Sequence, residues 1–191
     1  MDTKRLFDIM NAIGRLTISL TMVLLLGGCA AFSNDPRVRT PGTMFDDGVI
    51  ESVVKRDIRK SDPGFANAHL IVVSYNGTVL LAGQVASREL KQKAQEVAQR
   101  VAKVRRIHNE LEIGGSISYL ARSNDTWLTG KVKSKLLANS RTDANKLKVV
   151  TENGTVYLMG ILRHAEADSV VDVTSQVYGV RQIVKVFEYL D

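Results

Sequence analysis

The chain has 191 residues, which is enough for one ordinary domain or two small ones. Its hydrophobic content of 45% and charged content of 24% are those of a globular protein, and a total of three prolines and 14 glycines argues against a low-complexity chain. The formal net charge of +6 favours acidic partners without identifying one.

The N-terminal segment has the pattern of a secretion signal. Lys4, Arg5 and Arg15 make its first part positive, and the uncharged stretch LTISLTMVLLL follows at residues 16–26. That stretch is shorter than the roughly 20 apolar residues of a membrane-spanning helix, and it matches the apolar core of a signal peptide. We therefore expect residues 1–28 to be a signal peptide.

Cys29, the only cysteine, follows this segment directly after two glycines. Small residues before a cysteine resemble the lipobox of bacterial lipoproteins, in which cleavage precedes the cysteine. The resemblance implies that Cys29 carries an S-linked diacylglycerol and an N-linked acyl chain, with no other cofactor, and several acyl chains make a stable membrane anchor. The alternative is a buried free thiol after an ordinary signal peptide. By the same resemblance, Ala30 in place of an aspartate favours the outer membrane and a protein that faces the periplasm.

A tether and a helix are expected next. Residues 29–45 contain Pro36 and Pro41 and show no apolar periodicity, which favours a lipidated N-terminus followed by a flexible tether. Asp46 and Asp47 stand where a helix is expected to begin, and acidic side chains there act as caps and interact favourably with the helix dipole. A pair of catalytic carboxylates is the alternative. The apolar residues that predict the helix are spaced four apart: Ile50, Val54 and Ile58.

Two near-identical stretches predict two β-hairpins, LIVVSYNGTVLLAG at residues 70–83 and LKVVTENGTVYLMG at residues 147–160. An Asn-Gly pair supplies both residues of positive φ in a two-residue type I′ turn. The two pairs are Asn76-Gly77 and Asn153-Gly154. Gly83 and Gly160 end the second strand of each copy. We expect a side chain at either position to collide with the packed helix or to block the turn out of the strand; a close backbone approach by a ligand is the alternative.

The residues around the hairpins repeat as well. A helical pattern follows each hairpin, and a final strand follows that helix at residues 104–113 and 180–189. The order αββαβ predicts an α/β (α+β) fold for each copy, with a three-stranded mixed sheet covered on one face by two helices, the second of which is the crossover. We expect two tandem domains, at residues 46–113 and 124–191, joined by a linker at residues 114–123.

This element order, the Asn-Gly hairpin and the glycine at the end of the second strand resemble the BON domain, a module of bacterial periplasmic and envelope proteins. A lipobox followed by two such domains resembles the dual-BON outer-membrane lipoproteins. In that family the implied role is to bind anionic phospholipid and to support outer-membrane integrity. The resemblance rests on apolar and structural motifs, so it specifies the fold better than the function.

Little in the sequence suggests catalysis. The three histidines, His69, His108 and His164, lie far apart and form no H-x-x-H or H-E-x-x-H arrangement. No G-x-S-x-G elbow, Walker A loop or G-x-G-x-x-G occurs. We therefore expect no catalytic residue, no metal site and no small-molecule substrate. The moderate charge and the lack of an RNA-binding aromatic motif also argue against nucleic acid as a partner.

The first helix of the second copy carries the most distinctive residues. We expect it to run from about Thr126 to Ala138, with Ser123, Asn124 or Asp125 as its N-cap. Leu128, Val132 and Leu136 face its core. At about 100° per residue, Trp127 points about 140° away from that direction. Indole prefers the headgroup level of a bilayer, and a lysine near an anionic surface contributes about 1 kcal/mol. The residues that we expect to bind anionic phospholipid are Trp127, Gly130, Lys131, Ser134, Lys135, Leu137 and Ala138.

Two other interpretations of Trp127 stay open. Its side chain packs against the first domain or the linker around residues 117–120, or it contacts a protein partner. In the first copy Val49 takes its place and the start of the helix is acidic, so a division of labour would make the second domain the membrane-binding one and the first a spacer or a partner-binding unit. The rival function is a lipid-anchored protein-interaction module for envelope-assembly proteins, in which the BON domains recognise no lipid.

Overall fold

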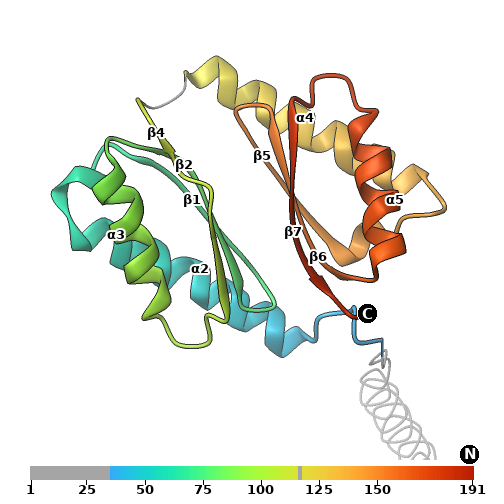
Figure 1. Ribbon diagram of the computed structural model, residues 1–191, viewed down its shortest axis with the longest axis horizontal. Coiled ribbons are helices and arrows are strands. Elements are labelled where there is room, and N and C mark those ends of the chain that lie inside the picture. Colours follow the sequence, from blue (N-terminus) through green and yellow to red (C-terminus); the bar gives the residue numbers. More distant parts are fainter. Residues whose placement is uncertain (1–34, 116–117) are drawn as a thin grey trace, which may run out of the picture. The chain divides into compact units, whose positions relative to one another are not determined.

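The computed structural model describes residues 35–115 and 118–191, of which 36–191 form one compact unit (Figure 1). The first repeat contains α2 (Pro41–Ser61), β1 (His69–Tyr75), β2 (Thr78–Val85), α3 (Arg88–Gln99), β3 (Arg106–Asn109) and β4 (Glu112–Ile113). The second contains α4 (Tyr119–Ala138), β5 (Leu147–Glu152), β6 (Thr155–Leu162), α5 (His164–Ser175) and β7 (Gln182–Tyr189). The predicted αββαβ order of both repeats is confirmed. The expected signal peptide and Cys29 lie outside the described residues.

Each repeat forms its own mixed sheet. β2 pairs antiparallel with β1 and parallel with β3 and β4, so that the last strand of the first repeat is split in two. β6 pairs antiparallel with β5 and parallel with β7. Short 3₁₀ turns precede both hairpins, at Pro63–Phe65 and Ala144–Lys146. None of the described helices is long and apolar enough to cross a membrane.

Both hairpins close through a two-residue turn. Asn76 and Gly77 have φ values of 52° and 72°, and Asn153 and Gly154 have 49° and 72°, which are the positive angles that a type I′ turn requires. Glycine takes such an angle without steric cost, and asparagine tolerates it better than most residues. The strands therefore return directly on themselves in both copies.

Gly83 and Gly160 are constrained by backbone and not by a helix. A Cβ at Gly83, whose φ is +106°, would clash with the carbonyl oxygen of His69 on the neighbouring strand. A Cβ at Gly160 would lie 3.0 Å from the carbonyl oxygen of Lys146 and 2.9 Å from the side chain of Leu147. The expected collision with the packed helix was therefore wrong, because the second strand approaches the start of the first strand more closely than it approaches the helix.

The first helix of each repeat begins earlier than its apolar spacing indicates. Thr40 caps α2, its hydroxyl accepting a hydrogen bond from the Thr43 amide, and Ser118 caps α4 in the same way through the Ala121 amide. The expected starts near residues 46 and 126 were wrong. One hydroxyl residue supplies each cap, and the turns that follow it contribute few residues to the core. Consequently Ser123, Asn124 and Asp125 lie inside α4 and do not cap it.

Asp47 is not a helix cap but a buried acceptor for the hairpin turn. Its carboxylate accepts hydrogen bonds from the amides of Asn76 and Gly77, both at 2.9 Å, and from the Ser74 hydroxyl at 2.6 Å. Arg39 donates a fourth at 2.7 Å. Burial on its own would raise the pKa of Asp47, but the hydrogen bonds from Gly77, Ser74, Arg39 and Asn76 outweigh burial and hold that pKa below its usual range.

The second repeat uses the same carboxylate. Asp125, one turn and a half inside α4, accepts from the amides of Asn153 at 2.7 Å and Gly154 at 2.9 Å. Asp46 does not form a pair of catalytic carboxylates with Asp47, since it forms an ion pair with Lys103 at 2.7 Å. A buried aspartate on the first helix therefore fixes the Asn-Gly turn in both repeats, and the catalytic-pair interpretation does not fit this geometry.

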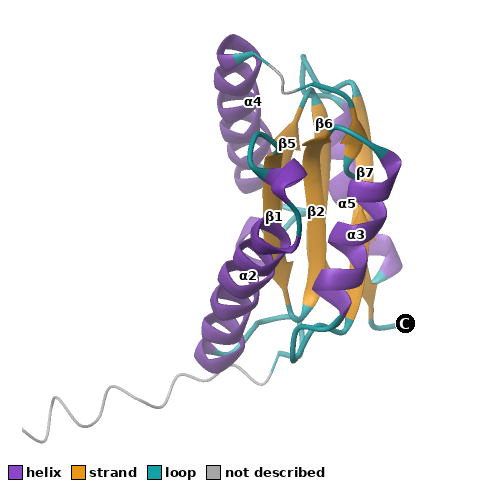
Figure 2. Ribbon diagram, turned by 90° about the vertical axis from the view of Figure 1, so that its left-hand side faces the viewer, coloured by secondary structure: helices purple, strands orange, loops and turns teal. Residues whose placement is uncertain are grey.

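The two sheets face each other, while the helices cover their outer faces (Figure 1); seen from the side of the first repeat, α2 and α3 lie in front of the strands (Figure 2). β2 and β6 are buried along their whole length. Alternate residues of a strand point to opposite faces of the sheet, and here one face packs against helices and the other against the second sheet. Val79 and Leu81 pack under the helices of their own repeat. The third core, between the sheets, consists of Val73, Tyr75, Leu80, Ala82, Tyr157, Met159, Ile161 and Val186.

Polar contacts border this third core. Gln84 donates to Glu152 at 2.8 Å, and both residues are buried. Lys148 of the second repeat pairs with Glu51 of the first at 2.7 Å. The repeats therefore pack as one unit, and the face of each sheet that no helix covers is closed by the other repeat.

Candidate functional site

The outer face of α4 is exposed as its periodicity predicts. Leu128, Val132 and Leu136 are at most 1% exposed, whereas Trp127 is 61% exposed and Leu137 is 64% exposed. Trp127 does not belong to the core between the two sheets. It therefore does not join the repeats to each other, which was one of the open interpretations.

Trp127 lies at one side of an open groove between α4 and the segment that follows α5. The groove has a volume of about 710 Å³. Five of the seven predicted lipid-binding residues line it, together with three residues from the segment after α5: Trp127, Gly130, Lys131, Ser134, Lys135, Gln176, Val177 and Tyr178. Leu137 and Ala138 are exposed on the same helix but lie outside the groove lining. A single surface thus contains aromatic, small and basic side chains from two parts of the chain.

Two lysines connect α4 to that second segment. Lys131 Nζ donates to the carbonyl oxygen of Tyr178 at 2.9 Å and stands 4.1 Å from the centre of the Trp127 ring and 5.6 Å from that of Tyr178. Lys135 Nζ donates to the carbonyl oxygen of Gln176 at 3.0 Å. Within residues 35–115 and 118–191, neither ammonium group has a carboxylate partner. The groove therefore holds two positive charges that no acidic side chain of the described chain neutralises.

Sequence periodicity missed two aromatic or apolar residues of this surface. Tyr178 is 89% exposed, yet it follows the end of α5, where no helical or strand pattern applies. Leu120 is 79% exposed and precedes Trp127 by two helical turns, so both point outward from α4. Leu120 was missed because the helix was expected to start at residue 126. The repeat itself offered the signal for Tyr178, because the first copy has Ala102 at the equivalent position.

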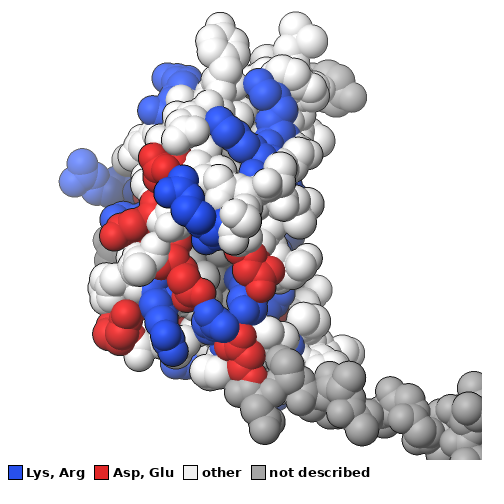
Figure 3. Space-filling view, turned by 90° about the vertical axis from the view of Figure 1, so that its right-hand side faces the viewer, with Lys and Arg blue, Asp and Glu red and all other residues white. Residues whose placement is uncertain are grey.

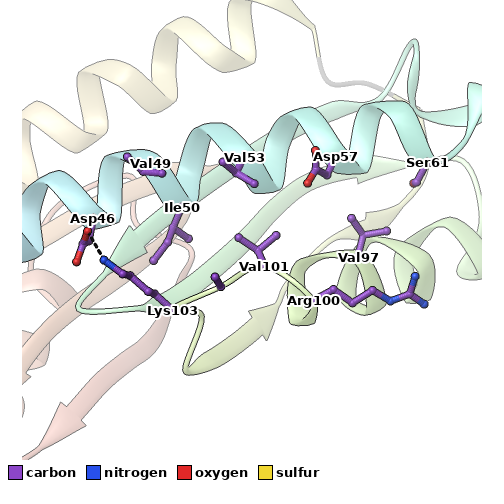
Figure 4. Close-up of a pocket in the computed structure, with 11 residues that line it drawn as sticks. Asp46, Val49, Ile50, Val53, Asp57, Ser61, Val97, Arg100, Val101 and Lys103 are labelled. Atoms are coloured by element: carbon purple, nitrogen blue, oxygen red, sulfur yellow. Dashed lines mark hydrogen bonds and ion pairs between the residues drawn. The ribbon is translucent and has the colours of Figure 1, made fainter.

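The first repeat has a groove in the same place (Figure 4). When the buried residues of α2 are aligned with those of α4, Val49 takes the position of Trp127 and Val53 takes the position of Lys131. This groove has a volume of about 500 Å³, lies between α2 and the end of α3, and is crossed by the ion pair between Asp46 and Lys103. The two repeats therefore share a groove but line it with different chemistry.

The histidines occupy separate places. His69 Nε2 lies 3.4 Å from Glu152, His164 Nδ1 lies 2.9 Å from Asp191, and burial lowers the pKa of His108. No group of three or more histidine, cysteine or acidic side chains with the spacing of a metal site occurs in the part of the chain that the structure describes.

The BON-domain sequence profile matches residues 46–115 and 124–191. The chain belongs to the BON-domain family. It is 36% identical to "Outer membrane lipoprotein DolP" of Haemophilus influenzae over 95% of this chain and 99% of that protein. It is 40% identical to "21 kDa hemolysin" of Actinobacillus pleuropneumoniae over 82% of this chain and 79% of that protein, and 26% identical to "Osmotically-inducible protein Y" of Escherichia coli over 88% and 90%.

The two BON domains are thus the two repeats described above, and the expected family is confirmed. The family match covers the hairpins, the helices and the sheets, all of which both domains share. It does not distinguish Trp127 from Val49, so the function of each groove has to be inferred from its own residues.

Proposed function

We propose that this protein is a periplasm-facing outer-membrane lipoprotein without catalytic activity, that its second BON domain binds anionic phospholipid, and that it supports outer-membrane integrity. The likeness to the Haemophilus influenzae lipoprotein along almost the whole chain supports the location. The observation that carries lipid binding is the groove of the second domain, in which an exposed indole stands beside two lysines that pair with no carboxylate of the described residues.

The exposed side chains suit the interface of a bilayer. Trp127, Tyr178 and Leu137 are each more than half exposed and project from the surface. Tryptophan and tyrosine concentrate at the headgroup level of membranes, where an apolar ring and a polar group are both satisfied. Leucine adds an apolar side chain for shallow insertion, the usual mode of an amphipathic helix lying on a membrane.

The lysines favour a negative headgroup over a zwitterionic one. Each lysine near an anionic surface contributes about 1 kcal/mol, and Lys131 and Lys135 have no competing carboxylate in the described chain. The Lys131 ammonium already occupies the face of the indole at 4.1 Å. A choline group would have to displace that ammonium in order to stack on Trp127, whereas a phosphate gains a partner without displacing anything.

The electrostatic attraction to anionic headgroups is expected to be local to this groove. On the side of the molecule that holds α5, basic and acidic side chains lie interspersed over much of the surface (Figure 3). A mixed surface produces no strong long-range field, and charges separated by more than about 8 Å are screened at physiological salt. Contact of the groove residues with the headgroups, and not the net charge of the whole chain, is therefore expected to determine binding.

Lipidation of Cys29 would make weak binding sufficient. An anchor keeps the second domain close to the leaflet and raises its effective concentration there. The domain would then exchange between membrane contact and the periplasm while the acyl chains stay inserted, and it would concentrate the protein where anionic lipid gathers.

A vesicle-binding experiment tests the proposal. Residues 30–191, which retain the whole compact unit, are mixed with vesicles of phosphatidylcholine and with vesicles that also contain phosphatidylglycerol, and the bound fraction is measured by flotation. We expect binding to the anionic vesicles only, weakened by salt. Trp127→Glu should weaken it about tenfold or more, since burial of a large apolar side chain contributes roughly 1.5–3 kcal/mol.

The matched control is Val49→Glu, at the equivalent position of the first domain, which should leave vesicle binding unchanged. Equal loss in both variants would show that Trp127 has no special role. Absence of binding to either vesicle by the folded wild-type protein would contradict lipid recognition by the second domain.

A further inference from the structure

The groove of the first BON domain is lined by apolar side chains from two elements. Its floor and walls include Val49 and Val53 of α2, Val97 of α3 and Val101 after it, and we call it the valine groove. Val97 and Val101 point toward α2 across the groove (Figure 4). Its volume of about 500 Å³ is enough for several side chains of another molecule.

The valine groove is apolar where the groove of the second domain is aromatic and basic, because three residues of the lining differ. Val49, Val53 and Ala102 replace a tryptophan, a lysine and a tyrosine. Val53 and Val101 of this groove are only partly buried. Apolar surface left in contact with water costs about 25 cal/mol per Å² relative to burial, so an apolar group that enters the groove is stabilised there.

A flat bilayer is a poor occupant for this groove. Val53 and Val101 are recessed between two elements, and a membrane surface inserts only side chains that project. The lining of the groove includes no tryptophan or tyrosine for the headgroup level, and it includes the carboxylates of Asp46 and Asp57. Apolar side chains on a protein segment can reach into the recess. Phe45, exposed one turn before Val49, extends the apolar surface at one end.

The charges around the opposite end indicate the sign of that segment. Arg100 lines the groove there, and Arg59 and Lys60 lie in the last turn of α2. None of these three has a carboxylate partner in the described ranges 35–115 and 118–191. The acidic residue among them, Asp57, is already paired with Arg56 at 2.9 Å. Carboxylates on an incoming segment would therefore meet unpaired cations.

We propose that the valine groove binds an amphipathic segment of a partner protein, with apolar side chains between α2 and α3 and carboxylates near Arg100 and Lys60. This is the helix-in-groove mode of peptide recognition, in which apolar anchors supply affinity and flanking charges supply specificity. The inference does not depend on lipid binding by the second domain, because it rests on a different groove and different residues.

The test is photocrosslinking in cells of the native host with the full chain. A photoreactive amino acid replaces Val53 in one strain and Lys55, which lies outside the groove lining, in another. We expect light to produce a discrete protein adduct from position 53 and none from position 55. The crosslinked segment of the partner should contain both spaced apolar residues and carboxylates.

The second stage measures affinity with that segment as a synthetic peptide. Arg100→Glu in the purified full chain should weaken peptide binding about tenfold, since it replaces a charge-assisted hydrogen bond with repulsion. Trp127→Glu should leave it unchanged. Thermal unfolding of both variants confirms that they are folded.

Three results would overturn the proposal. They are a phospholipid adduct at position 53 that disappears on delipidation, no adduct at position 53, or a peptide whose affinity is the same for the wild type and for Arg100→Glu. The first result would make the groove a second lipid site.

Discussion

The two BON domains bury equivalent residues and expose different ones. α2 buries Ile50, Val54 and Ile58, and α4 buries Leu128, Val132 and Leu136 at the same spacing. One step away on each helix, the first domain presents Val49 and the second presents Trp127. The fold therefore requires the buried residues, and the outward residues are where the two domains have diverged in chemistry.

The comparison also separates scaffold from function within the polar residues. Asp47 and Asp125 both hold an Asn-Gly turn against the first helix, so they belong to the shared scaffold. Lys131 and Lys135 hold the segment after α5 and leave their charges unpaired in the described chain, and the first domain has Val53 and Asp57 at these positions. Only the second domain combines an aromatic pair with unopposed lysines.

The largest expected effect is on the shared scaffold. Asp47→Ala leaves two turn amides, a hydroxyl and Arg39 without their acceptor, and we expect it to lower the free energy of unfolding by about 3–4 kcal/mol. Asp125→Ala should lower it by less, since among the described residues two turn amides and no arginine donate to Asp125. Chemical denaturation measures both. Equal losses would contradict the special role of Arg39 and Ser74.

The same carboxylate gives a pH dependence with a defined sign. The pKa of Asp47 is held below its ordinary value of 3.8 in the folded state. Its stabilising contribution is therefore complete above that ordinary value and is lost as pH falls through the lower folded value. The difference in unfolding free energy between the wild type and Asp47→Ala should stay constant from neutral pH down to about pH 5 and shrink below about pH 4. A difference that grew on acidification would contradict this assignment.

A glycine substitution should distinguish the two hairpins. Gly83→Ala combines a positive φ with a clash against the His69 carbonyl, and we expect a loss of about 2–3 kcal/mol. Gly160→Ala has no positive φ and meets a flexible leucine side chain and a carbonyl at 3.0 Å, so its loss should be smaller. Thermal unfolding of the two variants shows which one loses more stability, and a larger loss for Gly160→Ala would contradict this difference between the hairpins.

Removal of the two groove lysines should affect membrane binding more than stability, since each loses a single exposed hydrogen bond to a backbone carbonyl. The double variant Lys131→Gln and Lys135→Gln should weaken binding to anionic vesicles by about 2 kcal/mol, roughly 30-fold, and reduce its salt dependence. Lys55→Gln in the first domain is the control and should change nothing in this assay. An undiminished salt dependence in the double variant would place the electrostatic contact elsewhere.

The smallest expected effect is that of the loop aromatic. Tyr178→Ala removes an exposed phenol from the groove, and we expect vesicle affinity to fall by about 1 kcal/mol, roughly fivefold, with no change in unfolding temperature. Its counterpart Ala102 in the first domain provides the control, since Ala102→Gly should leave vesicle affinity unchanged. A normal affinity for Tyr178→Ala would confine the lipid contact to α4.

The local fold was predictable because its signals are local. Each Asn-Gly pair fixes a hairpin, and the four-residue spacing around Val54 and Val132 fixes a helix over it. The helix starts were not predictable from that spacing, since Thr40 and Ser118 are single capping residues ahead of the apolar pattern. In the sequence, a capping serine or threonine cannot be told from any other hydroxyl residue unless the helical turn that follows it is known.

The packing of the repeats and the full groove depend on contacts that are distant in sequence. The run of apolar residues in β2 shows that both faces of the strand are buried, but not that the second face meets β6. Trp127 was identified because a helix direction can be calculated from its neighbours. Tyr178 follows a helix end and has no such direction, so only the folded chain brings it beside Lys131.

The most direct measurement uses the single tryptophan of the chain as its own reporter. Trp127 is 61% exposed, so its fluorescence emission should lie near that of indole in water. The account predicts a shift to shorter wavelength when vesicles containing phosphatidylglycerol are added, quenching by lipids brominated near the headgroup end of the chain, and neither change with phosphatidylcholine alone. Emission that stays unchanged while the protein floats with anionic vesicles would contradict the account, because the protein would then bind through a surface that does not include Trp127.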